Sequence, residues 1–175
     1  MPAGCALTSD YSFRCDVGIG GTKECYIIEL ENITSFTESS GTLTAITKAT
    51  GKKFRKYQLV LETANFEETI TGDRKNGSVF YPQKGSIVIN KQSVAVRNEI
   101  LLLAKNKCVV VIKDNNLTYR LFGREYGLQV VSGSATTGVA WGDRNGYTLE
   151  FTGVELELSP FVQDSVILTL QTLGA

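Results

Sequence analysis

The 175-residue chain contains no histidine, and this absence limits the chemistry that its side chains can perform. Without imidazole there is no Ser-His-Asp or Cys-His nucleophile system, no histidine-containing zinc site and no imidazole general base. Carboxylates and lysines can still catalyse reactions, so the absence does not by itself exclude an enzyme. It removes the groups that enzymes use most often, and a protein that is not an enzyme is favoured.

Acidic residues are the remaining candidates for acid–base catalysis, which needs two carboxylates that face one site. Glu67 and Glu68 are neighbours on a predicted strand, so their side chains should point to opposite faces of the sheet. Glu155 and Glu157 share one face, and acids at this spacing are typical of a solvated or interface face. We therefore predict no catalytic residue and no residue that binds a cofactor.

The chain has four cysteines, Cys5, Cys15, Cys25 and Cys108, and their spacing matches no C-x₂-C zinc motif. A core of the size expected here does not need a disulfide scaffold. Reduced thiols are the favoured state, and no metal site is predicted. A Cys5–Cys15 disulfide and a four-cysteine zinc site are the alternatives that the sequence leaves open.

The glycine-rich segment from Gly18 to Lys23 shares only its composition with a phosphate-binding loop. In such a loop the lysine precedes the hydroxyl residue and a helix follows. Here Thr22 precedes Lys23 and a strand is predicted next, so no helix N-terminus would hold an anion. We predict a turn that leads into the first strand.

One dense basic cluster lies in the first half of the chain, between Lys48 and Lys56. Nucleic-acid phosphate is one partner that this cluster would suit, and an acidic neighbouring protein is the other. The chain has 18 basic and 18 acidic residues, and this balance favours the protein partner. We predict that residues 45–57 form a protruding hairpin arm that becomes ordered against another subunit.

Aromatic residues add a second candidate contact, the hairpin Arg74–Lys84. Phe80 and Tyr81 follow a polar turn, where they would either pack in the core or, if exposed, suit a protein–protein contact. For Trp141, beside Gly142, core packing is favoured. The residues predicted to form a subunit interface are Lys48, Lys52, Lys53, Arg55, Lys56, Arg74, Lys75, Phe80 and Tyr81.

Strands must position most of these residues, because alternation of apolar and polar residues dominates the sequence. The predicted strands cover 25–30, 42–47, 54–63, 65–71, 78–81, 85–90, 107–114, 117–122, 128–131, 135–141, 147–151, 154–158 and 166–170. Leu43 and Ala45 are expected on one face, and Pro82 to Lys84 should separate two strands. A helix is predicted at 94–105, with Ser93 as its N-cap.

These elements predict a mainly β fold, a β-sandwich or barrel of about ten strands with one flanking helix. We expect one domain over residues 1–175. Its first part, residues 1–24, should be an extended N-terminal segment. The N-terminus lacks the pattern of an export signal, and no apolar run is long enough for a membrane span. A soluble protein without membrane contact is expected.

The order in which several turn motifs follow one another is more informative about function than the composition. The motifs are Asn76-Gly77 before Phe80-Tyr81, Arg97-Asn98-Glu99-Ile100, Lys113-Asp114-Asn115-Asn116, Gly123-Arg124-Glu125-Tyr126-Gly127-Leu128, and TTGVAWGDRNGYTL at 136–149 before a final acidic strand. This succession resembles the tail tube-like structural proteins of tailed bacteriophages and related prophages. The resemblance covers about residues 26–158, and each motif alone is only weakly specific.

This resemblance implies a virion protein of the tail, assembled in the host bacterial cytoplasm into homo-oligomeric rings. The symmetry would be six-fold or pseudo-six- or twelve-fold, and the sequence does not fix it. Inner strands would line a channel that genomic DNA crosses without sequence recognition, and neighbouring tail proteins would be further partners. A long tube and a short-tail collar both fit. The alternative is a monomeric carbohydrate-binding or adhesive β-sandwich, in which Phe80, Tyr81 and Trp141 would stack on sugars.

Overall fold

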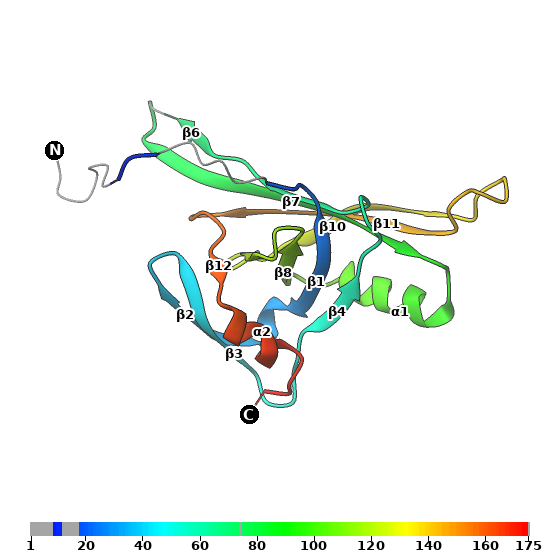
Figure 1. Ribbon diagram of the computed structural model, residues 1–175, viewed down its shortest axis with the longest axis horizontal. Coiled ribbons are helices and arrows are strands. Elements are labelled where there is room, and N and C mark those ends of the chain that lie inside the picture. The colour runs from blue at the N-terminus through cyan, green and yellow to red at the C-terminus, as the bar shows by residue number, and fades with distance from the viewer. Residues whose placement is uncertain (1–8, 12–17, 74, 175) are drawn as a thin grey trace.

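The computed structural model describes residues 9–11, 18–73 and 75–174 of the chain. Within these residues, half of the chain lies in strands, and twelve strands form two sheets (Figure 1). Two α-helices and the short 3₁₀ helix Leu30–Asn32 complete the described structure. The predicted fold class, mainly β with a flanking helix, is confirmed. Neither described α-helix is long and apolar enough to cross a membrane.

The larger sheet has seven strands in the order β2-β3-β12-β9-β8-β1-β4. Their bounds are β1 Thr22–Glu29, β2 Ile33–Ser39, β3 Thr42–Lys48, β4 Arg55–Gln58, β8 Cys108–Asp114, β9 Tyr119–Phe122 and β12 Phe161–Val162. The apolar run of β8 is buried on both faces, as its composition predicts. The tight turn between β8 and β9 also forms as predicted, because the Asp114 carboxylate accepts hydrogen bonds from the Thr118 backbone and hydroxyl.

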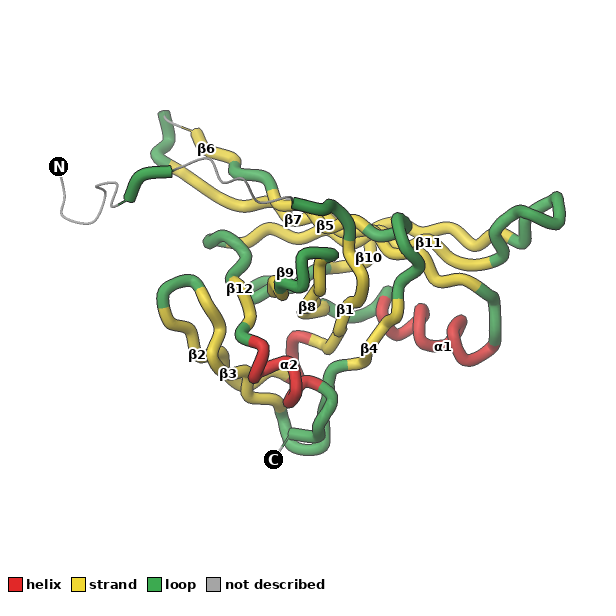
Figure 2. The backbone as a smooth tube through the Cα atoms, in the orientation of Figure 1, coloured by secondary structure: helices red, strands yellow, loops and turns green. Residues whose placement is uncertain are grey.

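The smaller sheet has the order β10-β11-β7-β5, and β6 pairs with the free end of β7. Its strands are β5 Asn65–Glu68, β6 Thr71–Asp73, β7 Ser78–Asn90, β10 Gln129–Thr136 and β11 Gly146–Glu155. Figure 2 shows that this sheet is longer than the rest of the molecule. Its β6–β7 end and the loop between β10 and β11 both project beyond the body.

Two apolar clusters lie on opposite faces of the larger sheet. Alternate residues of β1 divide between them: Cys25 and Ile27 face the smaller sheet, whereas Tyr26 and Ile28 face the other way. The first cluster joins the two sheets through residues such as Phe151. The second cluster joins β3, β12 and the C-terminal helix to the far face of β1 and β8. Burial on both faces explains why the central strands are continuously apolar.

The predicted helix forms as α1, Val94–Leu103, two residues shorter than expected at its C-terminal end. The hydroxyl of Ser93 accepts a hydrogen bond from the Val96 amide, so the predicted N-cap is confirmed. Ile100 and Leu103 pack on the inter-sheet cluster. The helix therefore flanks the sheets and covers one end of the core (Figure 1).

The prediction of a strand at 166–170 is wrong, because this segment lies in a second helix, α2, Asp164–Leu170. Val166 and Leu170 are four residues apart and both are buried in the second apolar cluster. That spacing places them on one face of a helix. A short apolar run fits a strand and a helix equally well by sequence, and packing decides between them.

The expected break at Pro82 to Lys84 is absent, because β7 is one strand of 13 residues. Pro82 lacks an N–H, but it lies opposite Thr69, in the gap where β5 has ended and β6 has not begun. Its carbonyl accepts a hydrogen bond from the Thr69 amide. The missing donor therefore interrupts neither the pairing of β5 nor that of β6 with β7.

Further corrections concern β11 and β3. Residues 146–155 form one strand, β11, where two strands at 147–151 and 154–158 were expected, and Leu156 and Leu158 lie beyond its end and are exposed. In β3, Ala45 does not share the face of Leu43. The register shifts between these residues, so Ile46 is buried in place of Ala45.

Candidate functional site

The residues predicted to form a subunit interface do not lie on one surface. Lys48 is buried, and its ammonium group donates hydrogen bonds to the carbonyls of Thr169, Leu170 and Thr172 at the C-terminal end of α2. Burial lowers the pKa of Lys48. This lysine satisfies free carbonyls at a helix end within its own chain.

The predicted hairpin arm at 45–57 is wrong, because β3 pairs with β2 and β4 pairs with β1. The loop between them is tied to the C-terminal segment: Gly51 donates to the Gly174 carbonyl and Gly174 donates to Lys52. Phe54, just before β4, is completely buried. Contacts with residues more than a hundred positions away therefore order a segment that has few apolar residues of its own.

The other predicted interface residues have separate environments. Lys56 forms an ion pair with Glu24, with 3.0 Å between Nζ and the carboxylate oxygen. Lys52, Arg55 and Lys75 are exposed, Lys53, Phe80 and Tyr81 are half-buried, and Arg74 lies outside the described residues. The three exposed cations come from two different parts of the fold, the segment around β4 and the turn before β7.

Core packing of Trp141, which the sequence favoured, is wrong, because this side chain is fully exposed. The strand expected at 135–141 ends at Thr136, and residues 137–145 form the loop that joins β10 to β11. Phe80 and Tyr81 lie near the other end of the sheet. Tyr81 pairs with Glu155, whereas Asn90 pairs with Gly146 beside the loop. The nine intervening steps along β7 span about 30 Å, so these rings do not form a common aromatic surface with Trp141.

Glu67 and Glu68 point to opposite faces, as predicted, and Glu68 forms a buried polar network that the sequence does not reveal. Its carboxylate accepts hydrogen bonds from Arg120 Nη2 at 3.1 Å, the Ser159 amide at 2.9 Å and Gln83 Nε2 at 2.7 Å. Gln83 in turn accepts a hydrogen bond from the Gly123 amide. The network joins β5 of one sheet to β9 of the other.

Glu155 is buried, so the predicted solvated face shared with Glu157 is wrong for this residue. Its carboxylate accepts hydrogen bonds from the backbone amides of Glu125 and Tyr126, at 3.0 and 3.1 Å. Burial raises the pKa of Glu155, and these amides oppose the rise. The carboxylate holds the loop between β9 and β10 in place. Glu68 and Glu155 are thus both held by hydrogen-bond donors of the fold.

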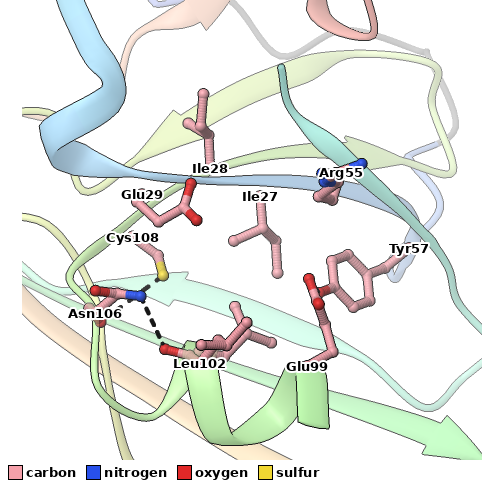
Figure 3. Close-up of a pocket in the computed structure, with 10 residues that line it drawn as sticks. Ile27, Ile28, Glu29, Arg55, Tyr57, Glu99, Leu102, Asn106 and Cys108 are labelled. Carbon is pink, nitrogen blue, oxygen red and sulfur yellow. Dashed lines mark hydrogen bonds between the residues drawn. The ribbon is translucent and has the colours of Figure 1, made fainter. Parts of the chain in front are cut away.

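A small cavity of about 30 Å³ lies between β1, β4 and α1 (Figure 3). Tyr57 donates a hydrogen bond to Glu99 across it, and Cys108 lies at its far side. Burial raises the pKa of the Cys108 thiol to about 12, and that of Cys25 to the same range. Both thiols are free, in agreement with the predicted reduced state, and a thiol with this pKa is protonated and unreactive. Cys5 and Cys15 lie outside the described residues.

The outer face of the smaller sheet is mostly polar, with Val88 and Val154 as apolar exceptions. Leu149 and Phe151 of β11 point into the core, so Thr148, Glu150 and Thr152 between and beside them point outward. The register extends this outer face to neighbouring strands, where it includes Ser132, Ser134, Ser86, Lys84, Asn65 and Glu67. One face of this sheet is therefore packed on the core and the other is open to solvent.

The strand β10 is a long, uncharged edge that is interrupted by one β-bulge, between Val130 and Ser132. Among the described residues it pairs along its length only with β11, and its eight residues, QVVSGSAT, include no charge and no proline. The opposite edge of the same sheet is short: β5 has four residues, two of them glutamates. Soluble monomers usually shorten, charge or cover such edges, because free backbone groups pair with other strands.

The loop at residues 137–145 is held by Asp143, and this contact gives a first testable prediction. One carboxylate oxygen accepts the amides of Val139 and Ala140, both at 2.8 Å. These hydrogen bonds lower the pKa of Asp143. The order they provide should be complete above the unfolded-state pKa of 3.8 and lost as the pH falls through the lower pKa of the folded state.

Hydrogen exchange of the Val139 and Ala140 amides measures this order directly. Asp143→Ala should speed exchange at both amides at neutral pH, whereas Asp143→Asn, which keeps a carbonyl oxygen as acceptor, should change it far less. Equal exchange rates in all three proteins would show that the carboxylate does not order the loop.

Comparison of the chain with protein-family models, with curated proteins and with solved structures gives no match.

Proposed function

We propose that this chain is a ring-forming structural protein of a tailed-bacteriophage virion, a subunit of a tail tube or tail collar around the channel for the genome. The observation that carries the proposal is the uncharged edge strand β10 in a sheet with one covered and one polar face. The resemblance of the ordered turn motifs supports the same function.

The free edge supports assembly because pairing satisfies its backbone groups. In the smaller sheet, β10 forms one edge, and β5 with β6 forms the other. If β10 of one copy pairs with the opposite edge of the next, the sheet continues from subunit to subunit. A ring forms when the constant rotation at each such step brings the last copy back to the first. The interface is heterologous, since two different edges meet.

The polar outer face suits a surface that DNA passes without being held. It carries many hydroxyl side chains, and its charged residues on the described strands are Glu67, Asp73, Glu150 and Lys84. Tight binding of DNA requires several cations that neutralise phosphates. One lysine between two glutamates does not supply them. In the ring this face would line the channel, with neighbouring tail proteins above and below, and assembly would occur in the host bacterial cytoplasm.

Adding charge to the edge tests this proposal. A Val131→Lys, Ser134→Lys double variant should reduce ring formation at least ten-fold, because each subunit would bring two lysines to the pairing edge. Both residues are exposed, so the unfolding free energy should change by less than about 0.5 kcal/mol. Native mass spectrometry and negative-stain microscopy of concentrated protein measure the assemblies.

The matched control is Leu168→Lys, which adds a lysine to an exposed position of α2, away from both sheet edges. It should assemble like the wild-type protein. A wild-type chain that stays monomeric at every concentration, and forms no ring in lysates or virions, would contradict the proposed function. Rings that persist in the double variant would exclude β10 as the pairing edge.

A further inference from the structure

The chain contains two Asn-Gly pairs, Asn76-Gly77 and Asn145-Gly146. This dipeptide is chemically labile, because glycine has no side chain to hinder attack by its own backbone nitrogen on the preceding side-chain amide. The attack requires the two residues to move toward each other, so the fold decides which pair reacts. The two pairs lie in different surroundings in this fold.

Asn76 and Gly77 lie in an exposed turn that leads from β6 into β7 (Figure 1). Gly77 has a positive φ of 65°, and apart from its chain neighbours no described atom lies within 4 Å of where a Cβ would stand. The strand β6 has only three residues and, among the described strands, pairs with β7 alone. Movement of the turn therefore disturbs little of the remaining fold.

The second pair has the same sequence in a segment that is held on both sides. Gly146 is buried and begins β11, between Asn90 of β7 and Thr136 of β10. The Asn145 carbonyl accepts a hydrogen bond from the Lys91 amide, with 2.6 Å between nitrogen and oxygen. The peptide that joins Asn145 to Gly146 can rotate only when the end of the sheet opens locally.

We infer that Asn76 is a site of spontaneous deamidation in the folded protein and that Asn145 is protected. The Gly77 nitrogen attacks the side-chain carbonyl carbon of Asn76, so a C–N bond forms and the bond to the amide nitrogen breaks. Ammonia leaves with the proton that Gly77 loses, and a succinimide ring remains. Water then opens the ring at either carbonyl, which gives aspartate or isoaspartate. Water is the co-reactant, and the inference is independent of the proposed function.

The product brings a second negative charge to Asp73. In the amide form, Asn76 Nδ2 donates a hydrogen bond to one Asp73 oxygen at 2.7 Å. The other oxygen accepts the backbone amides of Lys75 and Asn76 at 2.8 and 3.3 Å. After deamidation a carboxylate replaces the side-chain donor, and two like charges this close repel each other. The turn should therefore open, and β6 should lose its pairing with β7.

Peptide mapping by mass spectrometry, on protein stored at mildly alkaline pH, measures the conversion of each pair. In the folded protein, Asn76 should convert roughly ten-fold or more faster than Asn145, because the sheet must open before Gly146 can react. In urea the two pairs should convert at similar rates, since only the shared dipeptide remains. Equal rates in the folded protein, or conversion of Asn76 only in urea, would overturn the inference.

Asn76→Gln is the control for the chemistry, because its longer side chain keeps the amide but must close a larger ring. It should prevent conversion at position 76 and leave the rate at Asn145 unchanged. Conversion at position 76 at the original rate would exclude the attack by Gly77.

Hydrogen exchange, corrected for intrinsic rates, measures the effect on the turn. Asn76→Asp, which corresponds to the aspartate product, should speed exchange at the amides of residues 75 and 76 several-fold. Asn76→Ala is the matched control, because it removes the same side-chain hydrogen bond without adding a charge, and its effect should be smaller. Equal exchange in the two variants would show that repulsion from Asp73 does not open the turn.

Discussion

A Glu68→Ala variant should lose about 3 kcal/mol of unfolding free energy, the largest effect expected from a single polar residue of this chain. The Glu68 side chain is only 3% exposed and accepts hydrogen bonds from Arg120, Ser159 and Gln83. Removing it leaves the buried Ser159 amide and the Gln83 side chain without an acceptor. Each such loss costs about 1–3 kcal/mol.

Arg120 limits the size of the effect. About a third of its side chain is exposed, so water can solvate part of the guanidinium when its partner is removed. This exposure places the expected loss at the lower end of the 3–5 kcal/mol that breaking a fully buried ion pair costs. The loss would weaken the connection between the two sheets, since Glu68 lies on β5 and Arg120 on β9.

Urea unfolding followed by circular dichroism measures the change. The matched control is Glu67→Ala, because Glu67 is the next residue along the strand but is exposed on the outer face. It should change the unfolding free energy by less than about 0.5 kcal/mol. If the two variants were equally stable, the buried network would contribute nothing, and the sheets would be joined by apolar contacts alone.

A Lys48→Ala variant should lose about 2–3 kcal/mol of unfolding free energy. The ammonium group is the donor for three carbonyls at the end of α2, and a hydrogen bond to a charged group contributes about 1.5–3 kcal/mol. Its charge also stabilises the negative end of the helix, although α2 has only seven residues. Without the lysine, the C-terminal segment and the loop after β3 would lose a common attachment.

Lys52→Ala is the control, since this lysine side chain is exposed and lies four residues later, in the loop that follows β3. Its effect should be below about 0.5 kcal/mol. Chemical denaturation and native mass spectrometry should be measured for both variants. If Lys48→Ala keeps its stability but no longer assembles, Lys48 contacts another subunit and the buried position is wrong. A loss of stability without any effect specific to assembly supports the structural role.

Together these predictions separate two kinds of charged residue. Lys48, Glu68 and Glu155 have partners within the subunit and should affect its stability. Exposed groups such as Lys52 and Arg55 should affect only contacts with other molecules. Mutations of the first kind would reduce assembly indirectly, because fewer subunits would be folded. Stability must therefore be measured beside assembly for every variant.

The sequence by itself determined the local features of this protein. Alternation of apolar and polar residues predicts strands, and the spacing around Val96 and Ile100 predicts α1 with Ser93 as its cap. The residues after β8 predict the turn at Asp114. These features depend on interactions between residues at most four positions apart, which a sequence pattern contains. The mainly β class follows from them.

Only the tertiary structure decided which residues are covered and what they contact. Lys48 finds its acceptors 121 to 124 positions away, and Glu68 finds Ser159 91 positions away. The acceptors of Lys48 are all backbone carbonyls, which every residue carries and no sequence pattern marks, and the donors to Glu68 come from three separate segments of the chain. Trp141 shows the converse. Its large apolar side chain favoured a place in the core, but β10 ends before it, and the ring lies exposed in a loop. Burial is set by contacts between distant segments, and these contacts exist only once the chain has folded.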